Sequence, residues 1–214
     1  MPFRGWPAEA LEFFDGLEAD NSKTFWEANK ATYQRCVRGP TEQLLEELAP
    51  EFGPGKLFRP YRDVRFSKDK SPYKTNIAAM VGETGYLSLS AGGLEVGSGM
   101  YHMAPDQLDR YRRALDDEGT GGELDALAAA LGRRGMELIA HDALKTVPRG
   151  YAKDHPRADL LRRKGLAAIR HFEPAAWLGT AKARTRVADT LRATAPLRAW
   201  LAANVGPTTA LPST

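Results

Sequence analysis

The sequence predicts an α+β fold: a single domain in which a largely antiparallel central sheet is covered by helices from the N- and C-terminal parts. Apolar residues recur at helical spacing near both ends of the chain and alternate with a period of two in its middle. A chain of 214 residues with 43% hydrophobic content can also bury one substantial core. We therefore expect one domain over residues 1–201, and a frayed tail over residues 202–214, where the periodicity is lost.

The first 50 residues are predicted to be helical. Pro7 suits the first turn of a helix. An apolar stripe at helical spacing follows it, made of Leu11, Phe14 and Leu17. Ser22 or Asn21 can cap a second helix, which Gly39-Pro40 is expected to end, and a third helix should cover residues 41–48.

After residue 55 the period changes from helical to alternating. A strand over residues 58–66 would present one set of side chains on one face (Arg59, Tyr61, Asp63, Arg65) and the other set on the opposite face (Phe58, Arg62, Val64, Phe66). Three more strands are predicted at Ile77–Val81, Tyr86–Leu89 and Leu94–Val96. Gly92-Gly93 between the last two is typical of a hairpin turn.

The second half of the chain is predicted to return mainly to helices. One helix begins near Pro105. A polar, glycine-rich loop over residues 116–122 separates it from the next helix. A short helix should start at Pro156, a strand should cover residues 166–172, and the remainder is expected to be helical.

Composition narrows the function classes only modestly. The net charge is +3 and the pI is near 9.0, which is too mild to indicate nucleic-acid binding by itself. No apolar run approaches the roughly 20 residues that a membrane span needs, and the first residues lack a signal peptide, so we expect a soluble, cytoplasmic protein without membrane partners. Cys36 is the single cysteine, which agrees with a reducing compartment.

Positive charge is concentrated in two segments. Residues 56–75 hold seven cations and two acids, a local balance of +5 in a protein whose total is +3. A second basic segment covers residues 145–170. If the fold brings the two segments together, they form one basic cleft; if it does not, they are separate solvated faces.

Several of these stretches resemble a known family, the one catalogued as domain of unknown function 2461. The resemblance begins with Phe3-Arg-Gly-Trp6 and continues through the RPYRDVRFSKDKSPYK motif at residues 59–74, Gly99-Met-Tyr101 and Lys145-Thr-Val-Pro-Arg-Gly-Tyr151. It extends to about Leu201. The family has no established activity, so the resemblance implies no catalytic residues.

The 59–74 motif is the best candidate site. Asp63 would accept hydrogen bonds from a flanking guanidinium, and arginine forks fixed in this way suit phosphate or carboxylate. The candidate ligand-binding residues are Arg59, Arg62, Arg65, Ser67, Lys68, Lys70, Tyr73, Lys74, Tyr101, Lys145 and Lys153. If a reaction takes place, Asp63 or His102 is the candidate for proton transfer. No histidine pair has metal-ligand spacing, no metal site is predicted, and the sequence indicates no particular cofactor.

Three hypotheses follow. The first is an anion-binding protein, possibly an enzyme, whose ligand is phosphate-like or nucleotide-like. The second is a nucleic-acid-binding protein that uses the same basic surface; it is less favoured because residues 1–55 and 75–144 are acidic, with net charges of -5 and -6. The third is a structural or interaction module, in which the charged motif is an ion-pair network that sets the fold.

Overall fold

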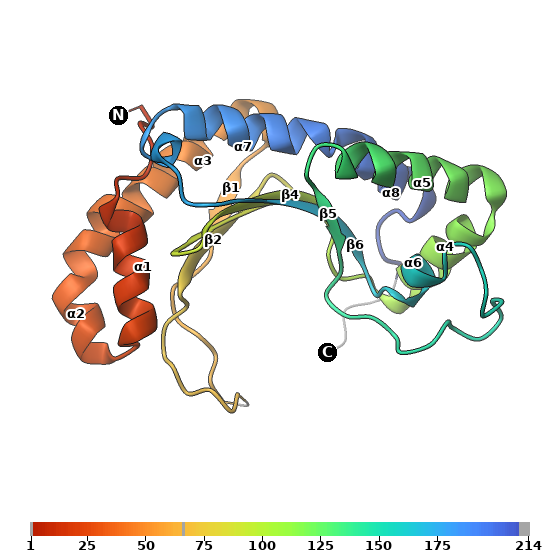
Figure 1. Cartoon of the computed structure of the whole chain (residues 1–214), viewed down its shortest axis with the longest axis horizontal. Helices are drawn as coiled ribbons and strands as arrows, with labels where there is room; N and C mark the ends of the chain where they lie inside the picture. Colours follow the sequence, from red (N-terminus) through yellow and green to blue (C-terminus); the bar gives the residue numbers. More distant parts are fainter. Residues whose placement is uncertain (1, 66, 210–214) are drawn as a thin grey trace. The chain divides into compact units, whose positions relative to one another are not determined.

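The computed structural model describes residues 2–65 and 67–209 and confirms the α+β fold (Figure 1). Within these residues the strands form one six-stranded sheet in the order β1-β2-β3-β4-β6-β5. The chain divides into two compact units, Met1–Val96 with His171–Thr190 (unit 1) and Gly97–Arg170 with Leu191–Thr214 (unit 2). The expectation of one domain over residues 1–201 stays a prediction.

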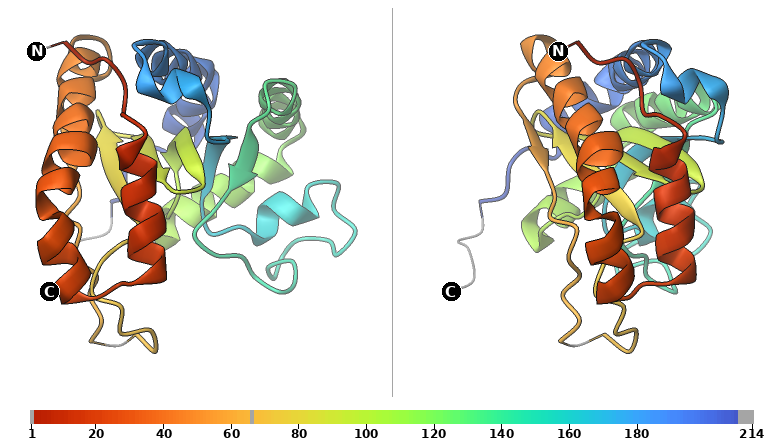
Figure 2. Two further views of the ribbon diagram at one scale, coloured as in Figure 1. Left: turned by 60° about the vertical axis from the view of Figure 1, so that its left-hand side comes forward. Right: turned by 90° about the vertical axis from the view of Figure 1, so that its left-hand side faces the viewer.

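Unit 1 opens with helices. These are α1 (Glu9–Ala19), α2 (Lys23–Thr32), the π-helical turn η1 (Tyr33–Arg38) and α3 (Gly39–Phe52). Ser22 caps α2, because its hydroxyl accepts a hydrogen bond from the backbone N–H of Phe25. The predicted stripe of α1 faces the core through Phe14 and Leu17, which are fully buried. Figures 1 and 2 show α1 and α2 side by side.

The prediction that Gly39-Pro40 ends the second helix is wrong. The backbone N–H of Gly39 donates to the carbonyl of Gln34, five residues earlier, so the helix widens by one residue at this point. Pro40 lies in the first turn of α3 and has no N–H to donate, but the bond from Gly39 carries the helix past it. The helical path therefore continues through the proline instead of stopping.

The strands of unit 1 confirm most of the predicted pattern. They are β1 (Gly55–Leu57), β2 (Asn76–Val81), β3 (Gly85–Ser90) and β4 (Gly93–Met100), the last of which continues into unit 2. β2 pairs antiparallel with β3, and Ile77 lies opposite Leu89 with both side chains buried. Gly93 begins β4 with φ +111°, and a Cβ there would lie 2.1 Å from the carbonyl oxygen of Phe172. Only glycine fits this end of the predicted hairpin turn.

Unit 2 carries most of the remaining elements. They are α4 (Pro105–Asp116), α5 (Glu118–Gly132), β5 (Glu137–Ile139), α6 (Ala158–Arg162) and α8 (Ala195–Asn204). Two elements run through both units, β6 (Leu166–Phe172) and α7 (Lys182–Ala193), and η2 (Ala176–Gly179) belongs to unit 1. The helix predicted from Pro105 and the strand predicted over residues 166–172 are confirmed.

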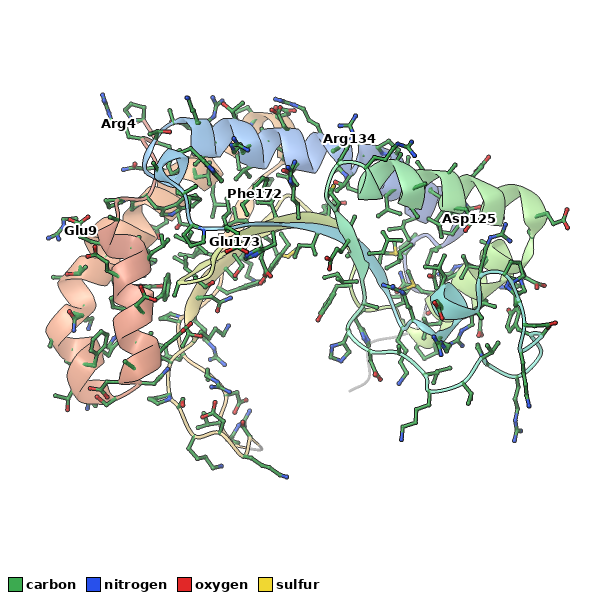
Figure 3. All side chains as sticks on the ribbon, in the orientation of Figure 1. Arg4, Glu9, Asp125, Arg134, Phe172 and Glu173 are labelled. Atoms are coloured by element: carbon green, nitrogen blue, oxygen red, sulfur yellow. The ribbon has the colours of Figure 1, made fainter. Side chains whose placement is uncertain are left out.

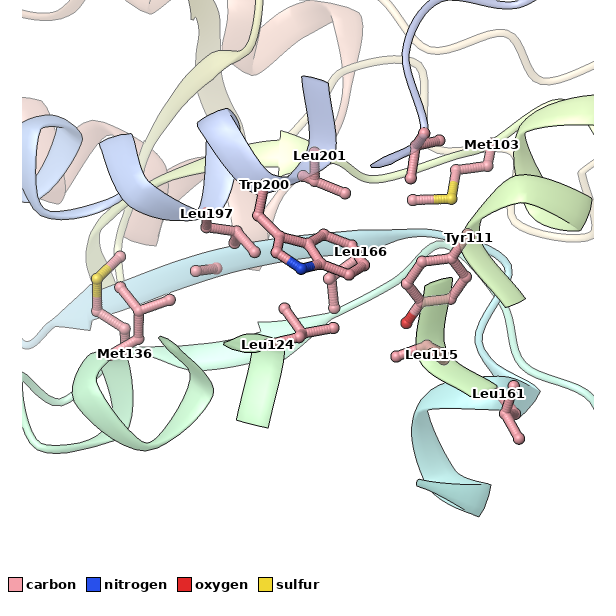
Figure 4. Close-up of a cluster of buried hydrophobic side chains, with 13 residues drawn as sticks. Met103, Tyr111, Leu115, Leu124, Met136, Leu161, Leu166, Leu197, Trp200 and Leu201 are labelled. Carbon is pink, nitrogen blue, oxygen red and sulfur yellow. The ribbon is translucent and has the colours of Figure 1, made fainter. Parts of the chain in front are cut away.

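The core of unit 2 gathers large apolar side chains around Tyr111 and Trp200 (Figure 4). Their rings meet edge to face with centroids 6.4 Å apart, a favourable aromatic geometry. The indole N–H of Trp200 donates to the carbonyl of Thr120 at 2.9 Å. Leu124 and Leu166 are fully buried in the same cluster.

The glycine-rich stretch at residues 116–122 is not the loop that the sequence predicts. Asp117 caps a new helix there, accepting from the backbone N–H of Thr120 at 2.9 Å, and α5 begins at Glu118. Gly121 is needed within that helix for space. A Cβ at this position would lie 2.6 Å from the guanidinium carbon of Arg157.

The described part of the predicted tail is held by α4. α8 continues to Asn204, and Val205 is buried. Asp106 accepts hydrogen bonds from the hydroxyl of Thr208 at 2.7 Å and from the backbone N–H of Thr209 at 2.8 Å. These bonds hold the pKa of the Asp106 carboxyl well below its usual range. Residues 210–214 lie outside the described chain.

Among the described residues, no helix combines the length and the apolar character that a membrane crossing requires.

Candidate functional site

The first candidate site is the connection between β1 and β2 in unit 1, residues 58–75, called the basic loop. One antiparallel bridge, Tyr61 with Tyr73, closes it. The flanking backbone bonds run from the N–H of Arg62 to the carbonyl of Pro72 (2.9 Å) and from the N–H of Lys74 to the carbonyl of Pro60 (2.8 Å). Figures 1 and 2 show that the loop projects beyond the ends of α1 and α2.

The strand predicted over residues 58–66 is therefore wrong, apart from the single bridge at Tyr61. Regular pairing stops at Leu57, and after the bridge at Tyr61 the chain turns away as a loop. Pro60 and Pro72 explain this, because a proline has no N–H to continue a ladder. The single face predicted for Arg59, Tyr61, Asp63 and Arg65 does not extend past the bridge, and Phe66 lies outside the described residues.

Two ion pairs organise the tip of the basic loop. The guanidinium of Arg65 donates to both carboxylate oxygens of Asp63, from Nε at 3.0 Å and from Nη2 at 2.7 Å. Arg62 pairs with Asp69, which also accepts from the backbone N–H of Ser71 at 2.9 Å. Asp63 thus accepts bonds from a flanking guanidinium, as the sequence predicts, although within a turn and not along a strand.

These contacts stabilise the ionised carboxylates. The bonds from Arg65 hold the pKa of Asp63 below its usual range. The bonds from Ser71, followed by those from Arg62, lower the pKa of Asp69 to about 2. A carboxylate that is ionised and already accepts hydrogen bonds orients the arginines better than it would serve as a base.

The other cations of the loop are placed individually. Arg59 and Lys68 are exposed and make no ion pair among the described residues. Lys70 donates to the carbonyl of Val64 at 2.9 Å, and the ammonium of Lys74 lies 5.6 Å from the ring centroid of Phe58. Ser67 is half-buried. Figure 3 shows that many side chains at the tip of this loop extend away from the backbone.

The rings of the two bridge residues, Tyr61 and Tyr73, pack with those of Trp26 and Tyr33. These four rings are called the aromatic cluster. Trp26 stacks on Tyr73 with centroids 4.3 Å apart and planes 7° apart. Tyr33 lies 4.9 Å and Tyr61 6.1 Å from Trp26. Trp26 is only 2% exposed, whereas Tyr61 is 49% exposed. Burial raises the pKa of Tyr33 to about 12, so its phenol is neutral at physiological pH.

Asn21 fastens the loop to the helices, a role that the sequence analysis missed. Its side-chain amide donates to the carbonyl of Tyr73 at 3.1 Å, and its oxygen accepts from the N–H of Tyr73 at 3.0 Å. Two adjacent residues, Asn21 and Ser22, suit the cap of α2, and a helix uses one cap. Because only one of the two residues can cap α2, the sequence indicated that the other has a different partner.

The candidates in unit 2 form a separate ring group. Tyr101 is 51% exposed and His102 is exposed at the end of β4. The ring of His141 lies 5.5 Å from His102 and 5.9 Å from Tyr101, and its backbone N–H donates to the carbonyl of Tyr101 at 2.8 Å. His141 was not a predicted site residue. Across residues 2–65 and 67–209, no three His, Cys, Asp or Glu side chains are grouped to hold a metal ion.

The second basic segment, residues 145–170, lies entirely in unit 2. Lys145 and Lys153 are exposed on the connection between β5 and α6. Arg157 instead turns inward, with Nε 2.8 Å from Asp125 and Nη1 3.0 Å from the carbonyl of Leu115. Convergence of this segment with the basic loop stays a prediction.

Comparison with known proteins gives one match. The model of a family described as conserved hypothetical protein (DUF2461) matches residues 9–200. No curated protein and no solved structure matches the chain. The family match covers nearly the whole chain, including both basic segments and the aromatic cluster, and agrees with the resemblance seen in the sequence. This chain therefore belongs to the DUF2461 family of conserved hypothetical proteins.

Proposed function

We propose that this protein binds an anionic ligand bearing a phosphate group through the basic loop. The observation that carries the proposal is the arrangement of charge in that loop. It contains six cations (Arg59, Arg62, Arg65, Lys68, Lys70, Lys74) and two acids (Asp63, Asp69), a net charge of +4. Both acids pair with arginines and orient them, while Arg59 and Lys68 remain exposed. Oriented guanidinium groups beside exposed cations suit a phosphate.

A purely structural role explains this arrangement less well. The side chains of Arg65 and Asp63 are 77% and 46% exposed, and exposed ion pairs add little to stability. The aromatic cluster and the Asn21 bonds already fasten the base of the loop. The ion pairs at the tip join residues of the same loop, so they order the loop itself and tie it to no other element through the contacts described here.

Two variants test the proposal by thermal shift in inorganic phosphate, because a ligand that binds the folded state raises the melting temperature. Arg65→Ala should abolish the shift. Asp63→Asn should weaken phosphate affinity by about three- to tenfold, although it makes the loop more positive, because Arg65 loses its fixed orientation. The control is Arg134→Ala, an exposed arginine after α5 with the same charge change.

The Asp63→Asn result separates an organised site from bulk charge. If that variant bound phosphate more tightly, the loop would act only as a positive surface. An unchanged phosphate response in Arg65→Ala would remove the proposal.

Nucleic-acid binding is the second candidate, favoured by the exposed ring of Tyr61 next to the loop cations. Single strands bind through phosphates and through stacking of bases on aromatic rings. The test is fluorescence anisotropy with a labelled single-stranded oligonucleotide at several salt concentrations. This candidate requires an affinity that falls steeply as salt rises. No binding at low salt, or binding that is indifferent to salt, would reject it.

We also propose that the protein is cytoplasmic. Cys36 supports this, because a buried free thiol suits a reducing compartment.

A further inference from the structure

One buried polar atom in unit 1 lacks a partner. The indole Nε1 of Trp26 is buried and finds no hydrogen-bond acceptor among the described residues. Two other buried indoles show the usual arrangement: Trp6 donates to the hydroxyl of Thr41 at 2.9 Å, and Trp200 donates to the carbonyl of Thr120 at 2.9 Å. A buried donor without an acceptor is costly, so each one calls for an explanation.

The surroundings of Trp26 suggest the explanation. Trp26 belongs to the aromatic cluster, and one of its faces stacks on Tyr73. Tyr61 is the one member of the cluster with a largely exposed ring, and it is tilted by 51° to the indole plane at 6.1 Å. Its place is set by the backbone bridge to Tyr73. Phe13 also packs on the indole, edge to face at 5.9 Å, but it is buried, so Tyr61 is the ring that can turn away from Trp26 into solvent.

Cations flank the same bridge. Arg59 lies two residues before Tyr61, and both residues are exposed. Arg59 is also close enough to Asp63 to help lower the pKa of that carboxyl, after the larger effect of Arg65. Lys74 follows Tyr73 directly, and its backbone N–H bonds to the carbonyl of Pro60. A flat aromatic surface and exposed positive charge therefore meet at the base of the basic loop.

We infer that the aromatic cluster takes the planar ring of a phosphate monoester, such as a mononucleotide, with Trp26 Nε1 donating to an acceptor on that ring and Arg59 facing its phosphate. The inference rests on the proposed function and deepens it, because it names the ligand class. The ring stacks against Tyr61 once that side chain has turned, and the ester oxygens reach the cations of the loop. A heterocycle with a ring nitrogen or a carbonyl supplies the acceptor that the indole lacks.

The experiment follows the four indole N–H resonances of the ¹⁵N-labelled protein while ligand is added. The probes are AMP, ribose 5-phosphate and inorganic phosphate. AMP should move the Trp26 indole resonance and leave those of Trp6 and Trp200 in place, because these two already have internal acceptors. Ribose 5-phosphate and phosphate should bind without moving it. Trp26→Phe assigns the resonance and keeps an aromatic ring in the cluster.

A second variant tests the stacking. Tyr61→Ala should weaken AMP binding by about tenfold or more and change phosphate affinity by less than about twofold, since stacking of a base on an aromatic side chain contributes on this scale. Tyr61 is half-exposed, so the variant should fold, and the unchanged Trp6 and Trp200 resonances would show that it does.

The failures are distinguishable. If phosphate binds but saturating AMP leaves the Trp26 resonance unmoved, the indole N–H does not contact the ligand. This inference is then wrong, and the proposed function stands. If neither phosphate nor AMP binds, the proposed function fails, and this inference fails with it.

Discussion

The two basic segments of the chain use their cations in opposite ways. In the basic loop, Arg62 and Arg65 pair with acids of the same loop, and both pairs are exposed at its tip. In the second basic segment, Arg157 leaves its own segment for Asp125 and the carbonyl of Leu115, and Arg163 donates to the carbonyl of Leu138. Similar charge densities thus give exposed local pairs in the basic loop, whereas in the second segment Arg157 and Arg163 tie elements together and Arg162 pairs locally with Asp159.

The difference lies in where the acceptors are. Asp63 and Asp69 lie within two to seven residues of their arginines, so those arginines reach a carboxylate inside their own loop. Arg157 finds its acceptors 32 and 42 residues away, and reaching them requires the side chain to be buried, at 12% exposure. The position of the acceptor therefore decides whether a cation stays available to a ligand or becomes part of the fold.

Replacing the buried arginine should have the largest effect on stability. Arg157→Met removes the bond to Asp125 and leaves the carbonyl of Leu115 without its donor, at a cost of about 2–3 kcal/mol in the free energy of unfolding. Urea unfolding measures it. Arg149→Met is the matched control, since Arg149 is exposed in the same segment and its loss should cost less than about 0.5 kcal/mol. Equal losses in both variants would contradict the division between internal and exposed cations.

The fastening of the basic loop gives the next largest effect. Asn21→Ala removes both bonds to Tyr73, which should lower the free energy of unfolding by about 1–2 kcal/mol and free the base of the loop. Limited trypsin digestion should then cut faster within residues 59–74, which are rich in lysine and arginine.

The adjacent residue provides the control for this digestion. Ser22→Ala removes the cap of α2 and costs about 1 kcal/mol, but it leaves the Asn21 bonds intact. Its loop should be cut at the same rate as in the unaltered protein. Faster cleavage in both variants would mean that general instability, and not the Asn21 bonds, controls the loop.

The sequence predicts the sheet well because its strands depend on local alternation and on glycine turns. The strands predicted near residues 77–81, 86–89 and 94–96 are present, and β6 coincides with the predicted residues 166–172. The errors occur where a local signal has a competing answer. Gly39-Pro40 is typical of a helix end, but here the π-helical turn carries the chain past it. Residues 116–122 have the composition of a loop, but Asp117 caps a helix there, and Gly121 leaves room for the guanidinium of Arg157.

In the candidate site, contacts between residues close in the sequence could be predicted, and contacts between distant residues could not. The pairing of Asp63 with a neighbouring arginine could be predicted, because the residues are two apart. The bonds from Asn21 to Tyr73 and the stacking of Trp26 on Tyr73 could not, because they join residues about 50 positions apart through the fold. His141 was missed beside His102 for the same reason.

The smallest expected effect concerns the exposed lysines of the second basic segment. Lys145 and Lys153 are predicted ligand-binding residues, yet neither has a hydrogen bond or ion pair among the described residues that would orient it. The double variant Lys145→Ala with Lys153→Ala should change phosphate affinity by less than about twofold, because solvated charges act on a ligand only through a screened field. Isothermal titration at low salt and at 0.5 M NaCl measures this, and a purely screened contribution should vanish at the higher salt. A loss as large as that of Arg65→Ala, persisting at high salt, would break the comparison. It would show that Lys145 and Lys153 contribute to phosphate binding.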